Sequence, residues 1–261
     1  MPFLRSIMWC CALFLATFAQ AGVAAQETVA SQETTDASVI KNAPAAAPKP
    51  FSNQYISSAL GFKITVTHEL KQLDDDTYEM RFHAKSWFAS IEEVSRLRVD
   101  AESTQVIPLH YTYKRRGVGK NRDAELTFDW DKETVTNNVQ NISWKMDITQ
   151  RVQDKLSYQL QIQQDLRAGE KKFVYQIADG GRLKEYGFEV IGEEVLETPL
   201  GKVDTVQVKR SRDDDKRVTY AWLAKKWDFL LVRMQQEEKG KTYDVDLDTA
   251  MVDGKKITSF D

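Results

Sequence analysis

The side chains best suited to acid–base or metal chemistry in this sequence are its histidines, His68, His83 and His110. His68 and His83 lie in segments 62–70 and 78–84, where even-numbered positions are mostly apolar and odd-numbered positions mostly polar. Such alternation is typical of half-buried antiparallel strands, and even positions must then pair with even positions. His68 is therefore expected on the apolar face and His83 on the solvated face. Because histidines on opposite faces cannot share an ion, the hairpin predicts no metal site.

Motifs that support enzymatic chemistry are missing from the sequence. No serine lies in a Gly-x-Ser-x-Gly turn, and no nucleotide-binding glycine fingerprint is present. The acidic clusters 74–76 and 213–215 fall at predicted turns, where aspartates usually bond the backbone. Paired carboxylates for glycoside chemistry remain open, because the sequence does not fix their separation in space. We therefore predict a protein that is not an enzyme and has no cofactor.

A basic cluster follows a strand expected over 107–113, which carries Tyr111 and Tyr113 on one side. Its members Lys114, Arg115 and Arg116 could contact an anionic headgroup, a glycan or a phosphate. The alternative interpretation is a solvated, charged hairpin tip, which the sequence favours because the cluster lacks the context of a phosphate-binding loop.

The clearest structural signal is a series of hairpins over 186–247. Apolar residues alternate with polar ones between turns at 198–201, 212–216 and 238–241. We expect registers that place apolar residues opposite apolar residues, because a slip of one residue would bring polar residues against them. The expected cross-strand pairs are Val206 with Trp222, Val208 with Tyr220, Met234 with Val245, and Val232 with Leu247.

One segment, 154–167, has the periodicity of a helix instead. Leu156 and Leu160 are four residues apart, Asp154 can cap the start, and Gly169 can end it. Its apolar stripe must pack on the sheet, either as a structural cover or as a mobile lid over a ligand groove. Segment 92–100 fits both a helix and a strand, and the hairpins around it favour a strand.

These elements predict a mainly β fold: one large curved antiparallel sheet, a half-barrel or open barrel of hairpins, with one packed α-helix. A helix about 10–12 Å wide cannot cover a sheet of eight or more strands spaced ~4.8 Å apart. The sheet must therefore close into a packed barrel or leave an apolar groove. The residues expected to line such a groove are Val206, Val208, Tyr220, Trp222, Val232 and Met234.

The chain is expected to have three parts. Residues 1–25 resemble a cleaved signal peptide, with Arg5 before an apolar run and small residues at the cleavage site. Residues 26–50 are rich in Ala, Ser, Thr, Gln and Pro and predict a disordered linker. Residues 51–261 form a single β-rich domain. Cys10 and Cys11 both lie in the leader, and neither is placed for lipid modification.

This leader predicts a periplasmic protein without a stable transmembrane anchor after cleavage. Removing Arg5 leaves 35 basic against 39 acidic residues, and so mild an acidity argues against nucleic-acid binding.

The order of several short motifs resembles the bacterial family known as domain of unknown function 3108. They run from Phe128-Asp129-Trp130 through Gln153-Asp154-Lys155-Leu156-Ser157, Asp179-Gly180-Gly181, Gly192-Glu193-Glu194 and Leu196-Glu197-Thr198-Pro199-Leu200-Gly201 to Trp222-Leu223-Ala224 and Leu231-Val232-Arg233-Met234. Lys155 and Leu231 stand where prolines are common in that family, and both positions are interpreted as structural. The resemblance implies an exported, largely β envelope protein without an established activity or family catalytic residues. Its fold is similar in outline to the half-barrels of periplasmic lipoprotein carriers.

Two functions follow as expectations. The first is a non-enzymatic binding or carrier module for an amphipathic envelope molecule, such as a lipid or an acylated protein. The alternative is an envelope scaffold that binds a protein partner through a strand edge or surface patch and takes no small ligand.

Overall fold

The computed structural model describes residues 47–59, 62–117, 119–211, 217–238 and 240–260. Within them the chain forms fifteen strands, which belong to one sheet, and one α-helix. The elements are β1 (Phe51–Ala59), β2 (Phe62–Gln72), β3 (Tyr78–Lys85), β4 (Ala89–Val99), β5 (Val106–Gly117), β6 (Arg122–Asp129), β7 (Thr134–Val139), β8 (Ile142–Asp147), α2 (Ser157–Arg167), β9 (Lys172–Asp179), β10 (Arg182–Thr198), β11 (Gly201–Ser211), β12 (Arg217–Ala224), β13 (Leu230–Glu238), β14 (Lys241–Val252) and β15 (Lys255–Ile257).

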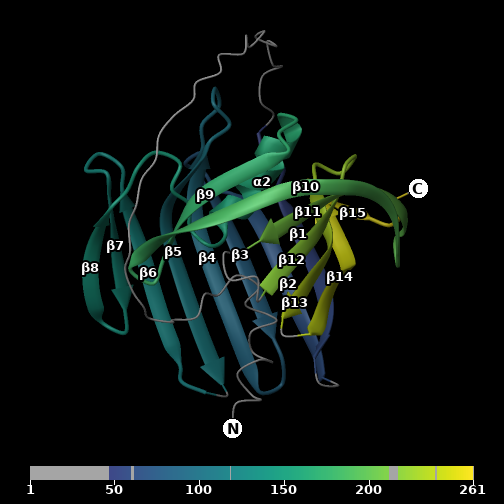
Figure 1. Cartoon of the computed structure of the whole chain (residues 1–261), viewed down its shortest axis with the longest axis horizontal. Helices are drawn as coiled ribbons and strands as arrows, with labels where there is room; N and C mark the ends of the chain where they lie inside the picture. Colours follow the sequence, from purple (N-terminus) through teal and green to yellow (C-terminus); the bar gives the residue numbers. More distant parts are fainter. Residues whose placement is uncertain (1–46, 60–61, 118, 212–216, 239, 261) are drawn as a thin grey trace, which may run out of the picture.

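The sheet is antiparallel and is built almost entirely from hairpins between consecutive strands. Its order runs from β8 down to β1, then from β14 down to β9, so the pairing of β1 with β14 joins the two halves of the chain. β8 and β9 end the two halves and do not pair with each other, so the curved sheet remains open. Figure 1 shows β9 and β10 crossing over the strands of the first half, with α2 beside them. The predicted fold class is confirmed.

The long strand β10 makes this crossing. It extends from Arg182 to Thr198, and its pairing with β11 shifts between Val190 and Gly192. A bulge of this kind bends a strand and increases its local twist. One end of β10 can therefore pair with β9 over the first half of the sheet while the other end stays with β11 (Figure 1).

The helix α2 is buried on nearly every side, including most of its polar residues. It begins at Ser157, a few residues after the predicted start, and Asp154 accepts hydrogen bonds from the backbone amides of Leu156 and Ser157 at 2.7 and 2.9 Å. Gly169 follows the helix with a φ of +85°, a conformation that favours glycine. The predicted helix is thus confirmed, and Gly169 follows its C-cap Ala168, whereas its N-cap residue is Leu156 and Asp154 bonds the turn that leads into it.

Polar side chains attach α2 to the strands on either side of it. The side chain of Gln161 accepts a hydrogen bond from the amide of Val106 in β5 at 2.7 Å. The hydroxyl of Tyr175 in β9 donates to Asp165 at 2.7 Å. These bonds tie α2 to both halves of the open sheet, as expected for a structural element of the core.

Most predicted registers are confirmed. His68 pairs with Phe82 and Met234 with Val245, segment 92–100 is almost entirely strand, and the turn at 198–201 joins β10 to β11. The predicted register between β11 and β12 was wrong by one residue: in the structure, Val206 pairs with Leu223 and Val208 with Ala221. The turn at 212–216 lies outside the described residues.

The reason for this error is the composition of β12. Its last five residues, 220–224, are all apolar, so a slip of one residue does not bring a polar side chain against Val206 or Val208. Alternation could not select the register there.

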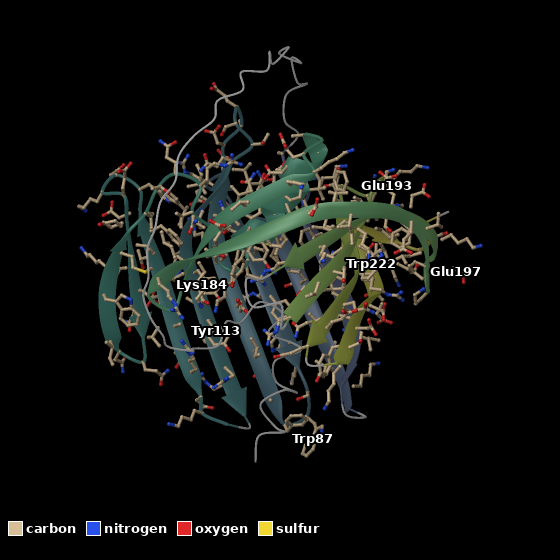
Figure 2. All side chains as sticks on the ribbon, in the orientation of Figure 1. Trp87, Tyr113, Lys184, Glu193, Glu197 and Trp222 are labelled. Atoms are coloured by element: carbon tan, nitrogen blue, oxygen red, sulfur yellow. The ribbon has the colours of Figure 1, made fainter. Side chains whose placement is uncertain are left out.

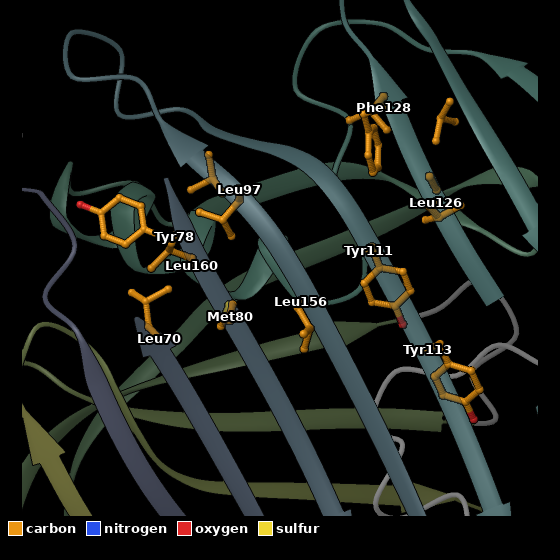
Figure 3. Packing of buried hydrophobic residues seen from close by; sticks show 14 of the residues in the cluster. Leu70, Tyr78, Met80, Leu97, Tyr111, Tyr113, Leu126, Phe128, Leu156 and Leu160 are labelled. Atoms are coloured by element: carbon orange, nitrogen blue, oxygen red, sulfur yellow. The ribbon is translucent and has the colours of Figure 1, made fainter. Parts of the chain in front are cut away.

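Three apolar clusters fill the curved sheet. One joins the first strands to the last ones, a second lies between the first half of the sheet and the start of α2, and a third lies between α2 and β9–β12. Figure 3 shows the second cluster, in which Leu156 and Leu160 approach residues of the sheet such as Met80, Leu97 and Tyr111. The interior is therefore shared between the sheet and a helix inside its curve.

The N-terminal predictions fall mostly outside the described residues, which begin at Ala47. At the end of the expected linker, Pro48 is buried and Lys49 forms an ion pair of 2.8 Å with Asp228. In the part of the chain that the structure describes, no helix has the length and apolar composition needed to cross a membrane.

Candidate functional site

A cavity lies between α2 and the concave face of the sheet. One wall is the segment from Lys155 to Gln163, and the rest comes from strands in both halves of the sheet. The centre of a water molecule can occupy about 90 Å³ of it. Because one water needs ~10–15 Å³ on this measure, there is room for several waters or for part of a small apolar molecule.

Most of the side chains around this cavity are apolar. Those of the sheet's first half are Phe51, Tyr55, Val66 and Phe82; those of the helical wall are Leu156, Tyr158 and Ile162; and those of the second half are Phe188, Val208, Ala221, Leu223, Leu230, Leu231, Met234 and Val245. An apolar enclosure with a few polar groups is the usual form of a small-molecule site.

The polar groups on the sheet side form a row across neighbouring strands. Asn53 of β1 pairs with His68 of β2, His68 pairs with Phe82 of β3, and Phe82 pairs with Glu93 of β4. All four residues line the cavity. Since adjacent strands lie ~4.8 Å apart, Asn53 and Glu93 are separated by roughly 14 Å, with a phenylalanine between the polar ends.

At one end of the row, Asn53 and His68 are buried, with 1% and 6% of their surface exposed. Within the described part of the chain, neither amide atom of Asn53 has a hydrogen-bond partner, nor has Nε2 of His68. The His68 ring lies edge-on to Phe51 and Phe82, with centroids 5.1 and 6.4 Å away. Burial lowers the pKa of His68 to about 4, so the imidazole is neutral at neutral pH.

At the other end, Glu93 and Lys155 both line the cavity, and the charge of Lys155 acts on the carboxyl of Glu93. The buried Glu93 carboxylate accepts a hydrogen bond from the hydroxyl of Tyr111. Burial raises the pKa of Glu93 to about 7, against the opposing effects of Lys155 and Tyr111. Glu93 can therefore hold or release a proton near neutral pH beside the cavity.

The charge of Lys155 is neutralised by the strand behind it. Its ammonium group lies 2.7 Å from Asp179 at the end of β9, and Lys184 of β10 contacts the same carboxylate. Burial opposes charge on Asp179, but the two lysines outweigh it and lower its pKa to about 2. Burial likewise disfavours the Lys155 cation, and Asp179 and Glu93 reverse this so that its pKa is raised. Figure 2 shows Lys184 and Tyr113, whose ring lies 5.4 Å from the Lys155 ammonium.

Asp154 completes this buried cluster. One of its oxygens accepts the bonds at the start of α2, and the other accepts a hydrogen bond from the hydroxyl of Ser95 at 2.6 Å. Its role is to fix the beginning of the helix beside the cavity. Among the described residues, no group of three or more His, Cys, Asp or Glu side chains is placed to hold a metal ion.

The structure brings only part of the predicted groove together. Val208 and Met234 line the cavity, and Val206 is buried nearby against α2. Tyr220 and Trp222 alternate with Ala221 and Leu223, which line the cavity, so their side chains point to the other face of β12. The prediction for these two was wrong for the same reason as the register.

Trp222 and Val232 belong to a neighbouring cluster. The indole of Trp222 donates a hydrogen bond to Glu194 of β10, and Figure 2 shows it in the C-terminal half of the sheet, apart from Tyr113 and Lys184. Val232 lines a separate hollow of about 230 Å³ near the turn at 198–201.

The basic residues of the β5–β6 hairpin do not line the cavity. Lys114 and Arg116 are exposed, and Arg115 is partly so. Arg115 donates to the carbonyl of Lys120, and Arg116 lies 2.6 Å from Asp123. The structure thus places them at a charged hairpin end, in agreement with the alternative interpretation.

The remaining histidines lie away from the cavity lining. His83 is half-buried and alternates with the cavity-lining Phe82 along β3, so it faces the opposite side from His68, as predicted. His110 forms an exposed contact of 2.6 Å with Glu125.

Sequence reasoning missed the polar residues of the cavity. Asn53 belongs to no motif, Glu93 lies in a segment that fits both a helix and a strand, and the motif comparison interprets Lys155 as a structural residue at the helix entry. One available signal was Lys155 itself, a lysine at a position where the resembling family often has a proline, directly before an apolar helix face. The ion pair of Lys155 with Asp179 and its electrostatic interaction with Glu93 depend on the proximity of distant segments.

The architecture is that of a β-barrel-like protein. The chain is similar to the crystal structure of a β-barrel-like protein of the domain-of-unknown-function family DUF1849 from Brucella abortus, with a TM-score of 0.54 and 10% sequence identity. The similarity covers 79% of this chain and 99% of the other. At this identity the likeness concerns the fold alone. No curated protein matches the sequence.

The chain belongs to the DUF3108 family, described as proteins of unknown function, whose family model matches residues 56–248. The resemblance stated from the sequence motifs is confirmed.

Proposed function

We propose that this protein is a non-enzymatic binding or carrier module for an amphipathic, lipid-like molecule of the bacterial envelope. The observation that carries the proposal is the largely apolar cavity between α2 and the concave face of the sheet. An open sheet curved around a buried helix leaves space that neither element fills, and such a space can accept the apolar part of a ligand.

The charges around the cavity favour binding over catalysis. Lys155 and Lys184 each form an ion pair with Asp179, and Asp154 fixes the helix start. These groups are used for structure, and among the described residues only Glu93 combines a position on the cavity wall with a pKa shifted to near neutrality. The periplasmic location of the protein, expected from its leader, is part of the proposal.

Two measurements test it. Native mass spectrometry of the protein purified from its own cells should detect a bound lipid-like molecule. The uncharged fluorescent probe N-phenyl-1-naphthylamine should bind the purified protein with increased emission. If no co-purified molecule and no probe binding are found, the proposal is refuted, and a protein partner captured by in-cell crosslinking would then support the scaffold alternative.

A matched pair of variants locates the binding site. Val208→Phe adds a ring to the cavity wall and should abolish probe binding. Val203→Phe makes the same change at a buried site of the neighbouring cluster that does not line the cavity. Both overpack the core and should cost roughly 1–3 kcal/mol of stability, so only a difference in binding between two folded variants supports the cavity.

A further inference from the structure

The polar end of the cavity formed by Asn53 and His68 has unused hydrogen-bonding capacity. The amide of Asn53 provides donors and an acceptor, and Nε2 of His68 provides one more position. In the part of the chain described, these atoms have no partner, although both side chains are more than nine-tenths buried and line the cavity. Buried polar groups without partners are costly, and proteins normally supply them with a partner.

The surroundings of this pair favour an uncharged partner. His68 is neutral at neutral pH, since burial lowers its pKa to about 4, and Phe51 and Phe82 flank its ring. The charged groups at the far end of the row are already paired, Lys155 with Asp179. A charged ligand group beside Asn53 and His68 would lose its hydration without gaining an opposite charge there.

Arg210 is the other cation on the cavity wall, and its guanidinium lies 3.5 Å above the ring centre of Tyr186. An anionic ligand would be expected to approach this residue. The unpartnered atoms on which the argument rests, however, are those of Asn53 and His68 in the described strands β1 and β2.

We infer that the Asn53–His68 pair binds an uncharged hydroxyl or amide head of an otherwise apolar ligand, whose chain lies along Phe82 towards the helical wall. This inference rests on the proposed function and specifies its ligand class. A hydroxyl group can donate to one of the two side chains while it accepts from the other, and the two residues are directly cross-strand neighbours.

The test compares 1-octanol, 1-chlorooctane and octanoate as competitors for bound N-phenyl-1-naphthylamine. The three share a chain length and differ in a hydroxyl, a weakly polar and an anionic head. In Asn53→Leu and in His68→Phe, the affinity for 1-octanol should fall about 3- to 10-fold, the usual effect of one lost neutral hydrogen bond. The affinity for 1-chlorooctane should change less than twofold.

The control is Asn137→Leu. Asn137 is a buried asparagine of β7, also with an unpartnered amide nitrogen, that does not line the cavity. It should leave all three affinities unchanged. Each substitution replaces a buried polar group by an apolar one, so the variants should remain folded, and urea unfolding confirms this.

Equal losses for 1-octanol and 1-chlorooctane in Asn53→Leu, or no loss for either, would overturn the inference while the proposed function stands. A preference for octanoate that disappears in Arg210→Met would also overturn it and assign an anionic ligand. If the fluorescent probe itself does not bind, the proposed function fails first.

Discussion

The buried carboxyl of Glu93 makes the stability of this protein depend on pH in a direction that can be worked out. Its pKa is raised from 4.5 to about 7 by burial, so the folded protein binds a proton more tightly than the unfolded chain. The stability that protonation provides is complete below pH 4.5 and is lost as the pH rises through 7. One pKa unit corresponds to 1.36 kcal/mol, so the loss is about 3 kcal/mol.

The substitution Glu93→Gln removes this dependence. A glutamine imitates the protonated carboxyl, and its oxygen can still accept the hydroxyl of Tyr111. The variant should therefore match the wild type near pH 4.5 and exceed its free energy of unfolding by about 3 kcal/mol at pH 8.

His68 acts in the opposite direction over nearly the same range. Burial lowers its pKa from 6.5 to about 4, so the unfolded chain binds a proton more tightly, and stability is lost as the pH falls from 6.5 through 4. The loss is again about 3 kcal/mol. Between about pH 4.5 and 6.5 the two effects offset each other in the wild type. The pH dependence due to His68 should therefore become visible in Glu93→Gln, and that due to Glu93 in His68→Phe.

Urea unfolding followed by tryptophan fluorescence at several pH values from 4.5 to 8 measures these differences. The quantity to compare is the variant minus the wild type at each pH, because other titrating groups then cancel. Glu102→Gln at an exposed turn is the control and should give a small constant difference. A difference for Glu93→Gln that does not grow with pH, or a variant less stable than the wild type at pH 8, would refute the assigned burial of Glu93.

Three further predictions concern the fold around the site. Gly117→Ala should destabilise the protein by roughly 1–3 kcal/mol more than Gly119→Ala in chemical denaturation. Both glycines have φ near +100°, so the backbone strain is similar. Only at Gly117 would the new Cβ also clash, at 2.2 Å from the carbonyl oxygen of Phe88. Asp154→Ala should lower the free energy of unfolding by about 2 kcal/mol or more, since it removes the hydrogen bonds at the start of α2. Asp154→Asn keeps an acceptor there and should recover part of the loss. Equal losses for the two variants in thermal melts would contradict the role of Asp154 in fixing the start of the helix. Trp222→Phe should reduce stability but leave probe affinity within twofold, because Trp222 does not line the cavity; a large loss of binding in a folded variant would count against the cavity.

The fold could be predicted from the sequence because its hairpins are local. Each described strand pairs with the next one along the chain except β8, which does not pair with β9, and the one long-range pairing between these strands is β1–β14, so alternation and turn residues carry most of the information. The exception at β12 is informative: a strand that is apolar at every position from 220 to 224 has no face that alternation can identify. The predicted register was wrong by one residue there, so it placed Tyr220 and Trp222 in the groove, whereas Ala221 and Leu223 line the cavity.

The candidate site could not be predicted in the same way, because it depends on contacts between distant segments. Glu93, Lys155 and Asp179 come from β4, the helix entry and the end of β9. They meet only because β9 and β10 cross back over the first half of the sheet (Figure 1). No spacing in the sequence records that crossing, and each residue taken alone looks like an ordinary surface charge.

The crossing also explains why a charged cluster lies beside an apolar cavity. A sheet this large has more concave surface than one helix can cover, so β9 and β10 cover part of it and bring Asp179 over the interior. Lys155 then forms its ion pair at the point where the chain enters α2, and a parallel bridge between Gln153 and Ile177 lies next to it. Breaking such a pair leaves an uncompensated buried charge, which is strongly destabilising. The cluster therefore fixes the position of α2 relative to β9, and that position sets the width of the cavity in which the ligand is proposed to bind.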